Sequence, residues 1–196
     1  MATPLKSYRE SLRSEMYNLI TSGEPFLIVD TETTGLLKDD PSQIIEISIV
    51  NQNGEVVFCS LIKADHSIPP ALTKFHGITD EDLAEAPTFT TIWPTLLGLL
   101  NGVKVYCYNV DFDLGMLRKT AKHYGEMVPP SYRWECVMKR YAAYHGEKGK
   151  YGDYKFQSLA TACGTLRVSM SEQHRATGDC LSTLAVMKAL ASLHTT

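Results

Sequence analysis

The sequence lacks several of the residue patterns that define familiar classes of protein. Its five cysteines are odd in number, widely separated and without a C-x-x-C pair. This argues against a disulfide framework or a zinc site and predicts reduced thiols in the core. The sequence also has no G-x-x-x-x-G-K-[ST] phosphate loop and no G-x-S-x-G nucleophile elbow. Nucleotide-triphosphate and serine-hydrolase chemistry are therefore poor hypotheses.

Long apolar runs are absent as well. No stretch reaches the ~18 apolar residues of a membrane span, and residues 1–23 are polar, without the apolar segment of a signal peptide. We therefore expect a cytoplasmic protein with no membrane partner. The chain has 196 residues, 44% of them hydrophobic, and no internal repeat or linker. It predicts a single domain over residues 1–196, with a leading helix in 1–24 and a core in 26–193.

The order of the apolar patterns predicts an α/β fold. Helical spacing between Leu5 and Leu19 ends at Gly23 and Pro25. Three strand-like runs follow, FLIVD, IIEISIV and VVFCSLIK, and the last two are joined by a turn at Asn51–Glu55. The remaining elements are a helix over 88–100, the strand KVYCY, a helix over 113–124, a short strand or helix start near WECVMKRYAAY, a glycine- and lysine-rich surface loop over 145–155, and a helix over 173–193. A meander followed by alternating strands and helices predicts a mixed sheet with helices packed against it.

Two acids one residue apart end the first strand, in LIVDTETTGL. Side chains alternate along a strand, so Asp30 and Glu32 point to the same side. Like charges placed in this way repel each other. Three explanations stay open from the residues alone. The pair marks the solvated, exposed end of a strand, it pairs with a basic cluster, or it binds a hard cation, which prefers oxygen ligands.

Two further acids lie near predicted helix starts. Asp113 follows the strand exit at Asn109, and a simple interpretation is that Asn109 or Asp111 caps the helix while Asp113 interacts with its dipole. Asp179 lies on an otherwise apolar stripe of the last helix, and His174 precedes it by five residues. Taken alone, a histidine beside a helix is more often structural or solvated than functional.

The three clusters would form a single site if the fold brings them together. Four carboxylates and no internal cation would be neutralised by two divalent ions, and oxygen-only ligation favours Mg²⁺ or Mn²⁺ over zinc. Two such ions ~3.5–4 Å apart clamp the attacking and leaving oxygens of a phosphodiester displacement. A histidine, with an unperturbed pKa of about 6.5, is suited to take a proton from the attacking water.

The segments VDTETTGL, YNVDFD and HRATGD, in this order, resemble the three motifs of the DEDDh 3′-to-5′ exonucleases. That family includes the proofreading epsilon subunit of bacterial replicative polymerase, exodeoxyribonuclease X and RNase T. The resemblance covers residues 26–193 and implies a ribonuclease H-like mixed sheet with helices on both faces. It further implies catalytic residues that comprise His174 as general base and, as ligands of two metal ions, Asp30, Glu32, Asp113 and Asp179.

The resemblance also implies substrate contacts. A glycine turn would hold the terminal nucleotide, the histidine of KFHGITDEDL would approach it, and an aromatic side chain would pack against its base or sugar. Tyr108 stands where several relatives have histidine, which leaves the details of substrate contact open. From the residues alone, His76 is equally a capping histidine and Phe112 a core residue. The predicted substrate-binding residues are Thr33, Thr34, Gly35, Leu36, His76, Tyr108, Asn109 and Phe112.

The function implied by the resemblance is a Mg²⁺-dependent exonuclease acting at DNA 3′ ends, with a role in proofreading or DNA repair and a polymerase or repair protein as partner. The segments HGIT and WECVMK resemble exodeoxyribonuclease X and favour DNA over RNA. One alternative is an exoribonuclease of the RNase T or oligoribonuclease type. A non-catalytic subunit that binds nucleic-acid ends is another, although such a protein has no need of a general base.

Overall fold

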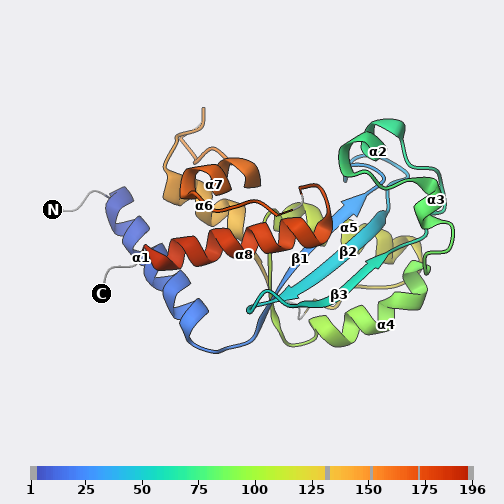
Figure 1. Cartoon of the computed structure of the whole chain (residues 1–196), viewed down its shortest axis with the longest axis horizontal. Helices are drawn as coiled ribbons and strands as arrows, with labels where there is room; N and C mark the ends of the chain where they lie inside the picture. The colour runs from blue at the N-terminus through green and yellow to red at the C-terminus, as the bar shows by residue number, and fades with distance from the viewer. Residues whose placement is uncertain (1–3, 131–132, 151, 172, 194–196) are drawn as a thin grey trace.

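The computed structural model describes residues 4–130, 133–150, 152–171 and 173–193. Within them lies a five-stranded sheet with the order β3-β2-β1-β4-β5 (Figure 1). The strands β1, β2 and β3 are antiparallel neighbours, whereas β4 and β5 run parallel to β1. The sheet is therefore mixed, as predicted. The strands are β1 Phe26–Thr33, β2 Ile44–Asn51, β3 Val56–Leu61, β4 Lys104–Cys107 and β5 Arg133–Cys136.

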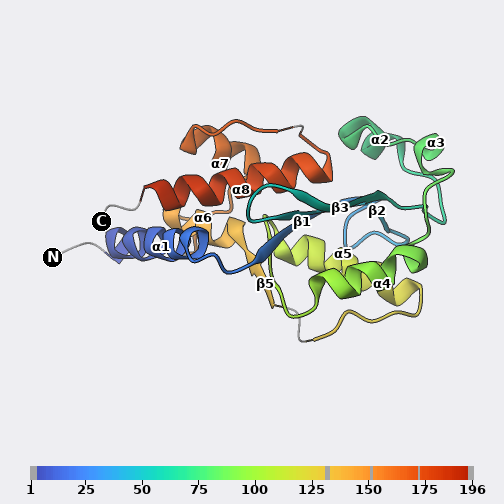
Figure 2. The same ribbon diagram turned by 60° about the horizontal axis from the view of Figure 1, so that its bottom comes forward.

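Helices cover both faces of this sheet (Figure 2). The helices α4 and α5 lie on one face, and α1, α6, α7 and α8 lie on the other. The short helices α2 and α3 lie beyond the end of β1 (Figure 1). The described helices are α1 Pro4–Thr21, α2 Pro70–His76, α3 Asp80–Leu83, α4 Phe89–Leu100, α5 Val110–His123, α6 Val137–His145, α7 Leu159–Leu166 and α8 Ala176–Ser192.

The alternation of side chains along β1 decides which face each of its residues serves. Leu27 and Val29 belong to the core on the α4 and α5 side, together with Trp93. Phe26 and Ile28 belong to the core on the opposite side, where they pack with residues of α1 and α8. Because the period of a strand is two residues, the even-numbered positions that follow at the end of β1 face the α8 side. The sheet thus directs its terminal acids toward the last helix.

The predicted order of elements is largely confirmed, and the differences lie in short segments. The helices α2, α3 and α7 were not predicted from the sequence, and α8 begins at Ala176, three residues later than expected. Near WECVMKRYAAY a short strand and a helix are both present. Four of the five cysteines are buried, but Cys59 is exposed, so the prediction of a core thiol is wrong there. None of the described helices is both long and apolar enough to cross a membrane.

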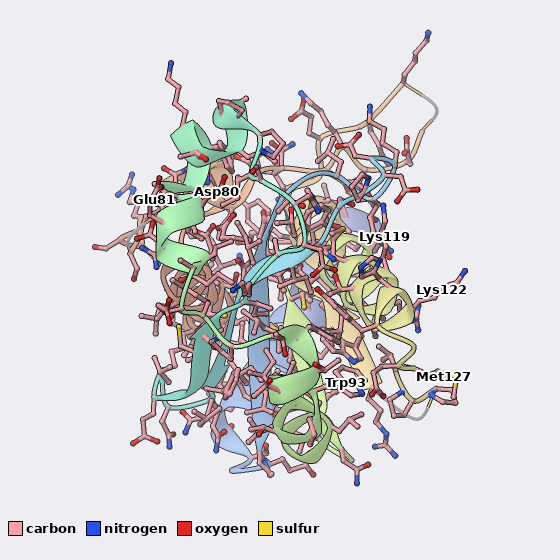
Figure 3. All side chains as sticks on the ribbon, turned by 90° about the vertical axis from the view of Figure 1, so that its right-hand side faces the viewer. Asp80, Glu81, Trp93, Lys119, Lys122 and Met127 are labelled. Atoms are coloured by element: carbon pink, nitrogen blue, oxygen red, sulfur yellow. The ribbon has the colours of Figure 1, made fainter. Side chains whose placement is uncertain are left out.

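The outer and inner sides of the helices α4 and α5 carry different kinds of residues. In Figure 3, Lys122 of α5 projects away from the protein, while Trp93 of α4 is only 2% exposed and belongs to the core. The acids Asp80 and Glu81 begin α3 on the opposite side of this view. Lys122, Asp80 and Glu81 thus lie on the outer surface of the protein.

Candidate active site

The first pair of acids lies where β1 leaves the sheet. Glu32 is 7% exposed, and Asp30 is partly exposed on the floor of a cavity. The pairing of β1 with β2 becomes irregular between Glu32 and Thr33, where the chain turns away from the sheet. Asp30 and Glu32 both face α8, so the expectation that they share one side of the strand is confirmed. They do not mark a solvated strand end.

The third acid comes from the first turn of α8. One carboxylate oxygen each of Asp30, Glu32 and Asp179 lie within 4.8 Å of one another. The Oδ1 atom of Asp179 is buried and has no hydrogen-bond partner among the described residues. An unpaired buried carboxylate oxygen is destabilising unless a donor or a cation reaches it. The three acids therefore fit a cation, because such an ion supplies the missing partner.

The fourth acid approaches from the other side of β1. Asp113 lies in the first turn of α5, is 3% exposed, and accepts a hydrogen bond from the hydroxyl of Thr31 over 2.9 Å. It lines the same cavity as the other three acids, although it is not one of the three oxygens that lie within 4.8 Å of one another. Asn109 precedes the helix as its cap residue but makes no side-chain cap hydrogen bond. The side chain of Asn109 instead lines the cavity.

The cavity that joins these acids has a volume of about 250 Å³. All five predicted catalytic residues line it, as do seven of the eight predicted substrate-binding residues. Four further residues line it that were not predicted from the sequence, namely Thr31, Leu72, Phe75 and Leu159. The lining combines four carboxylates with apolar side chains such as Leu36, Phe75 and Phe112, which suits a ligand that carries both a charged group and a flat apolar group.

The electrostatics of the cavity show how strongly the acids need a counter-charge. Burial and the neighbouring carboxylates raise the pKa of Glu32 to about 8, and burial raises the pKa of Asp113 to about 7. Burial likewise raises the pKa of Asp30 well above its ordinary value, and it raises the pKa of Asp179. Without cations the cluster would hold protons near neutral pH. Divalent ions would replace those protons and keep the carboxylates ionised.

His174 lies in the turn before α8, at the edge of the cavity. Its backbone has a φ of 59°, in the left-handed region, and its ring packs against the ring of Phe75 with a centroid distance of 3.8 Å. Phe75 is 55% exposed, which is unusual for a large apolar side chain. Its position directly before His76 in KFHGITDEDL was the only sequence signal for it.

Gly35 has a steric reason to be glycine. A β-carbon on Gly35 would lie 3.0 Å from the β-carbon of Ser42 and 3.2 Å from a carboxylate oxygen of Asp39. The turn is closed by a hydrogen bond that the Thr33 hydroxyl donates to the Gly35 carbonyl over 2.7 Å. A residue with a β-carbon would therefore crowd Ser42 and Asp39 and disturb this turn, which itself lines the cavity.

Three of the predicted substrate-binding residues differ in whether their polar groups remain available to a ligand, namely Thr34, His76 and Tyr108. Thr34 does not line the cavity, because its hydroxyl pairs with His66 and accepts the amide of Gln43, each over 2.9 Å. The hydroxyl of Tyr108 donates to the Gln157 carbonyl over 2.8 Å, and burial raises its pKa. Nδ1 of His76 accepts the amide of Ile78 over 3.1 Å, so a neutral ring carries its proton on Nε2. Burial lowers the pKa of His76, which favours that neutral form.

Comparison with known proteins places this site in a family. The RNase_T exonuclease family model matches residues 27–187, so the chain belongs to that family. It is 37% identical over 171 residues to an uncharacterized exonuclease of Escherichia phage 186, covering 84% of this chain and 87% of the phage protein. It is 30% identical over 173 residues to a putative bifunctional exonuclease/endonuclease of Mycobacterium tuberculosis, covering 84% of this chain but only 26% of that longer protein.

Solved structures agree with this assignment. Exonuclease X in complex with 5′ overhanging duplex DNA superposes with a TM-score of 0.64 at 23% identity, covering 87% of this chain and 94% of the other. The nuclease domain of 3′hExo, a DEDDh family member bound to rAMP, gives a TM-score of 0.70 at 15% identity, covering 87% and 93%. The fold is the ribonuclease H-like fold of these solved nucleases. The family match identifies the protein as an exonuclease.

Proposed function

We propose that this protein hydrolyses phosphodiester bonds from the 3′ end of DNA and releases nucleoside 5′-monophosphates. The observation that carries the proposal is the cluster of Asp30, Glu32 and Asp179, in which a buried oxygen of Asp179 has no partner in the described structure. A carboxylate cluster of this kind repels a phosphodiester anion unless cations bind first. The site is thus suited to chemistry at phosphate that depends on divalent ions.

The residues fit two divalent ions held by oxygen ligands. Asp30, Glu32 and Asp179 converge from β1 and α8, and Asp113 adds a carboxylate from α5. Mg²⁺, for which Mn²⁺ substitutes, is the expected cofactor because every proposed ligand is a hard oxygen. When bound, the ions would neutralise the phosphate and stabilise charge on the attacking and leaving oxygens.

The chain itself supplies the base and the binding surface. His174 takes the proton of the attacking water, since it lies at the edge of the cavity with its ring held against Phe75. Phe112 and Leu36 offer apolar surface to the terminal base or sugar, and such stacking tolerates any base. The Gly35 turn lines the part of the cavity proposed to hold the terminal nucleotide, and His76 with Asn109 adds polar contacts.

The test is digestion of 5′-labelled DNA and RNA oligonucleotides of matched sequence by one preparation. We expect a ladder of shortened labelled products with Mg²⁺ or Mn²⁺, faster on DNA, and none with a chelator. Asp179→Asn, which preserves the shape of the side chain, should lower the rate by several orders of magnitude. Asp111→Asn is a matched control, because Asp111 pairs with Lys139 over 2.6 Å and does not line the cavity.

Other results would redirect the proposal. Full activity of Asp179→Asn would contradict the metal assignment. Early release of the 5′ label as a mononucleotide would contradict digestion from the 3′ end. Faster digestion of RNA would favour the exoribonuclease alternative. Binding of the DNA and RNA oligonucleotides without any cleavage would favour a non-catalytic end-binding subunit.

A further inference from the structure

A fifth acid lies beside the carboxylate cluster, and the proposed mechanism does not use it. Glu46 of β2 stands opposite Glu32 in the register of the sheet and is 3% exposed. A buried carboxylate must be paired or it destabilises the fold. Its partners therefore indicate what Glu46 contributes.

Both oxygens of Glu46 are already satisfied. Oε1 accepts from Nη2 and Nε of Arg175 over 2.7 and 3.2 Å. Oε2 accepts from Nε of Arg175 over 3.2 Å and from the backbone amide of Ala176 over 3.0 Å. Glu46 is thus committed to the start of α8, and it is not one of the acids that converge as ligands.

This pairing replaces the usual cap of α8. Arg175 is the cap residue of the helix, but its side chain makes no cap hydrogen bond. The carboxylate of Glu46, from a strand distant in sequence, accepts the free amide of Ala176 instead and adds a favourable negative charge at the helix start. One residue pair therefore both caps α8 and ties it to the sheet.

A second contact fixes the same point. The hydroxyls of Ser48 and Thr177 lie 2.8 Å apart. Ser48 is two residues after Glu46 on β2, and Thr177 is two residues after Arg175 in the first turn of α8. The first turn of α8 is closed by the amide of Asp179, which donates to the Arg175 carbonyl over 3.0 Å. The strand β2 thus holds the residues immediately after the proposed base at two adjacent places.

The residue that most needs this support is His174. Its φ of 59° lies in the left-handed region, which is unfavourable for a residue with a β-carbon. Strained backbone of this kind persists only where surrounding contacts hold it. Arg175 is the next residue, so its pairing with Glu46 fixes one end of the strained turn, while Phe75 packs on the imidazole.

We propose that Glu46 and Arg175 are positioning residues whose ion pair sets the place of the His174 imidazole over the cavity. This inference rests on the proposed function, in which His174 is the general base. Because Arg175 neutralises Glu46, the pair holds the turn without adding a net charge beside the metal ligands. The ion pair acts through His174 and does not touch the substrate.

The test compares Glu46→Gln, Arg175→Gln and Arg175→Lys with the unaltered protein. Glu46→Gln keeps an oxygen for the Ala176 amide but loses the charged pairing, and lysine keeps the charge of Arg175 but not its two-pronged geometry. We expect kcat to fall about 10–100-fold in both glutamine variants, as is typical for residues that orient a catalytic group, with KM within about twofold of the original value. Arg175→Lys should be intermediate.

A second readout does not depend on catalysis. The Phe75 ring lies 3.8 Å from the His174 ring, so the imidazole C–H signals of His174 should carry a ring-current shift in an NMR spectrum. They can be assigned by their loss in His174→Ala. In the glutamine variants this shift should shrink, even if the protein proves to have a different activity. Arg140→Gln is the matched control, because Arg140 pairs with Glu135 over 2.8 Å on β5, away from the cavity.

Each outcome bears on the proposal. Reduced kcat together with a reduced His174 shift, in variants that remain folded at the assay temperature, supports it. Unchanged kcat with an unchanged shift overturns it. A lower melting temperature with the His174 signals unmoved also overturns it, because the pair would then contribute to stability alone. Loss of the shift without any nuclease activity in the unaltered protein would support the positioning role and contradict the proposed function.

Discussion

Substitutions of single residues at the cavity can separate catalysis from binding, and His174 is the residue for which the two differ most. A general base acts in the transition state and contributes little to binding of the ground state, so His174→Ala should lower kcat about 10²–10⁴-fold. The affinity for a DNA oligonucleotide, measured by fluorescence anisotropy with Ca²⁺ in place of Mg²⁺, should stay within about threefold.

A control histidine is available on the outer surface. His123 pairs with Asp65 over 2.7 Å and does not line the cavity, so His123→Ala should leave kcat unchanged. If His174→Ala instead loses affinity while kcat is retained, His174 is a substrate contact and the base must be sought elsewhere.

The raised pKa values at the site predict how stability responds to pH when metal is removed. The pKa of Glu32 rises from 4.5 to about 8 on folding, so its protonated form stabilises the folded state. That stabilisation is fully present below pH ~4.5 and is lost as the pH rises toward about 8. In a chelator the melting temperature should therefore fall between pH 5 and 8. Added Mg²⁺ should raise it more at pH 8 than at pH 5, where protons compete for the carboxylates.

Glu32→Gln removes this titration, so its melting temperature in chelator should fall less over the same range. Glu81→Gln serves as the control, because Glu81 lies on the exposed surface of α3 (Figure 3). Thermal denaturation followed by circular dichroism provides the measurement. A melting temperature of the metal-free protein that rises from pH 5 to pH 8 would show that the acids are not buried together as described.

At the scale of helices and strands, the sequence predicted the long elements and missed the short ones. The period of β1 and the stripe of Asp179, Thr183, Val186 and Leu190 on α8 were strong signals, and the last three of these residues are buried. The helices α2, α3 and α7 have only four to eight residues, too few for a helical period to stand out. They are set instead by local caps such as Thr79 and Ser158.

The missed helices explain three of the four cavity residues that the sequence did not reveal. Leu72 and Phe75 come from α2 and Leu159 from α7, so no argument from the strands alone could place them. Glu46 was hidden for another reason. In IIEISIV it has the appearance of an ordinary strand residue, and only the register of β2 against β1 brings it opposite Glu32. Register depends on contacts between distant segments, which the periodicity of one strand does not contain.

The leading helix offers a test of whether residues 1–24 and 26–193 form one folding unit, as predicted. Met16 of α1 is 1% exposed and shares a core with residues of α8. Met16→Ala should lower the free energy of unfolding by about 2–5 kcal/mol, because it leaves a cavity in that core. Met127→Ala is the matched control, since Met127 is 76% exposed (Figure 3).

Urea denaturation measures both variants. We expect the Met127 variant to stay within about 0.5 kcal/mol of the unaltered protein. A single transition that shifts as a whole in Met16→Ala agrees with one folding unit. Equal stability of both variants, or a separate early transition that involves α1 alone, would show that this helix is an appendage to an independent core.

The charge of the whole molecule limits how it can hold a nucleic acid. The formal net charge is −3, and it would be +1 without the four proposed metal ligands. By its composition, the lysine-rich loop over 145–155 is a candidate for contacts with the phosphates of a strand. Lys155 instead pairs with Glu147 over 2.8 Å, and the ammonium of Lys148 lies 3.8 Å from the centre of the Tyr154 ring. These internal contacts leave less free positive charge in that loop than its composition suggests.

We therefore expect a distributive enzyme that releases its strand after one or a few cuts, unless a polymerase or repair protein supplies further grip. Proteins that neutralise many phosphates show steep salt dependence, with log K falling by about 0.7 per phosphate for each tenfold rise in salt on single strands. Contacts confined to the metal site, the Gly35 turn and Phe112 should give a slope that corresponds to only a few phosphates.

The measurement is a time course with labelled single-stranded DNA and an excess of unlabelled competitor added with Mg²⁺. The labelled products should be shortened by only one or a few nucleotides. Cleavage should stop once the competitor captures the released enzyme. Affinity measured over a range of salt concentrations gives the number of phosphate contacts independently. Complete degradation of long strands within one binding event, together with a steep salt slope, would mean that positive charges gather along a track that the overall balance of charge conceals.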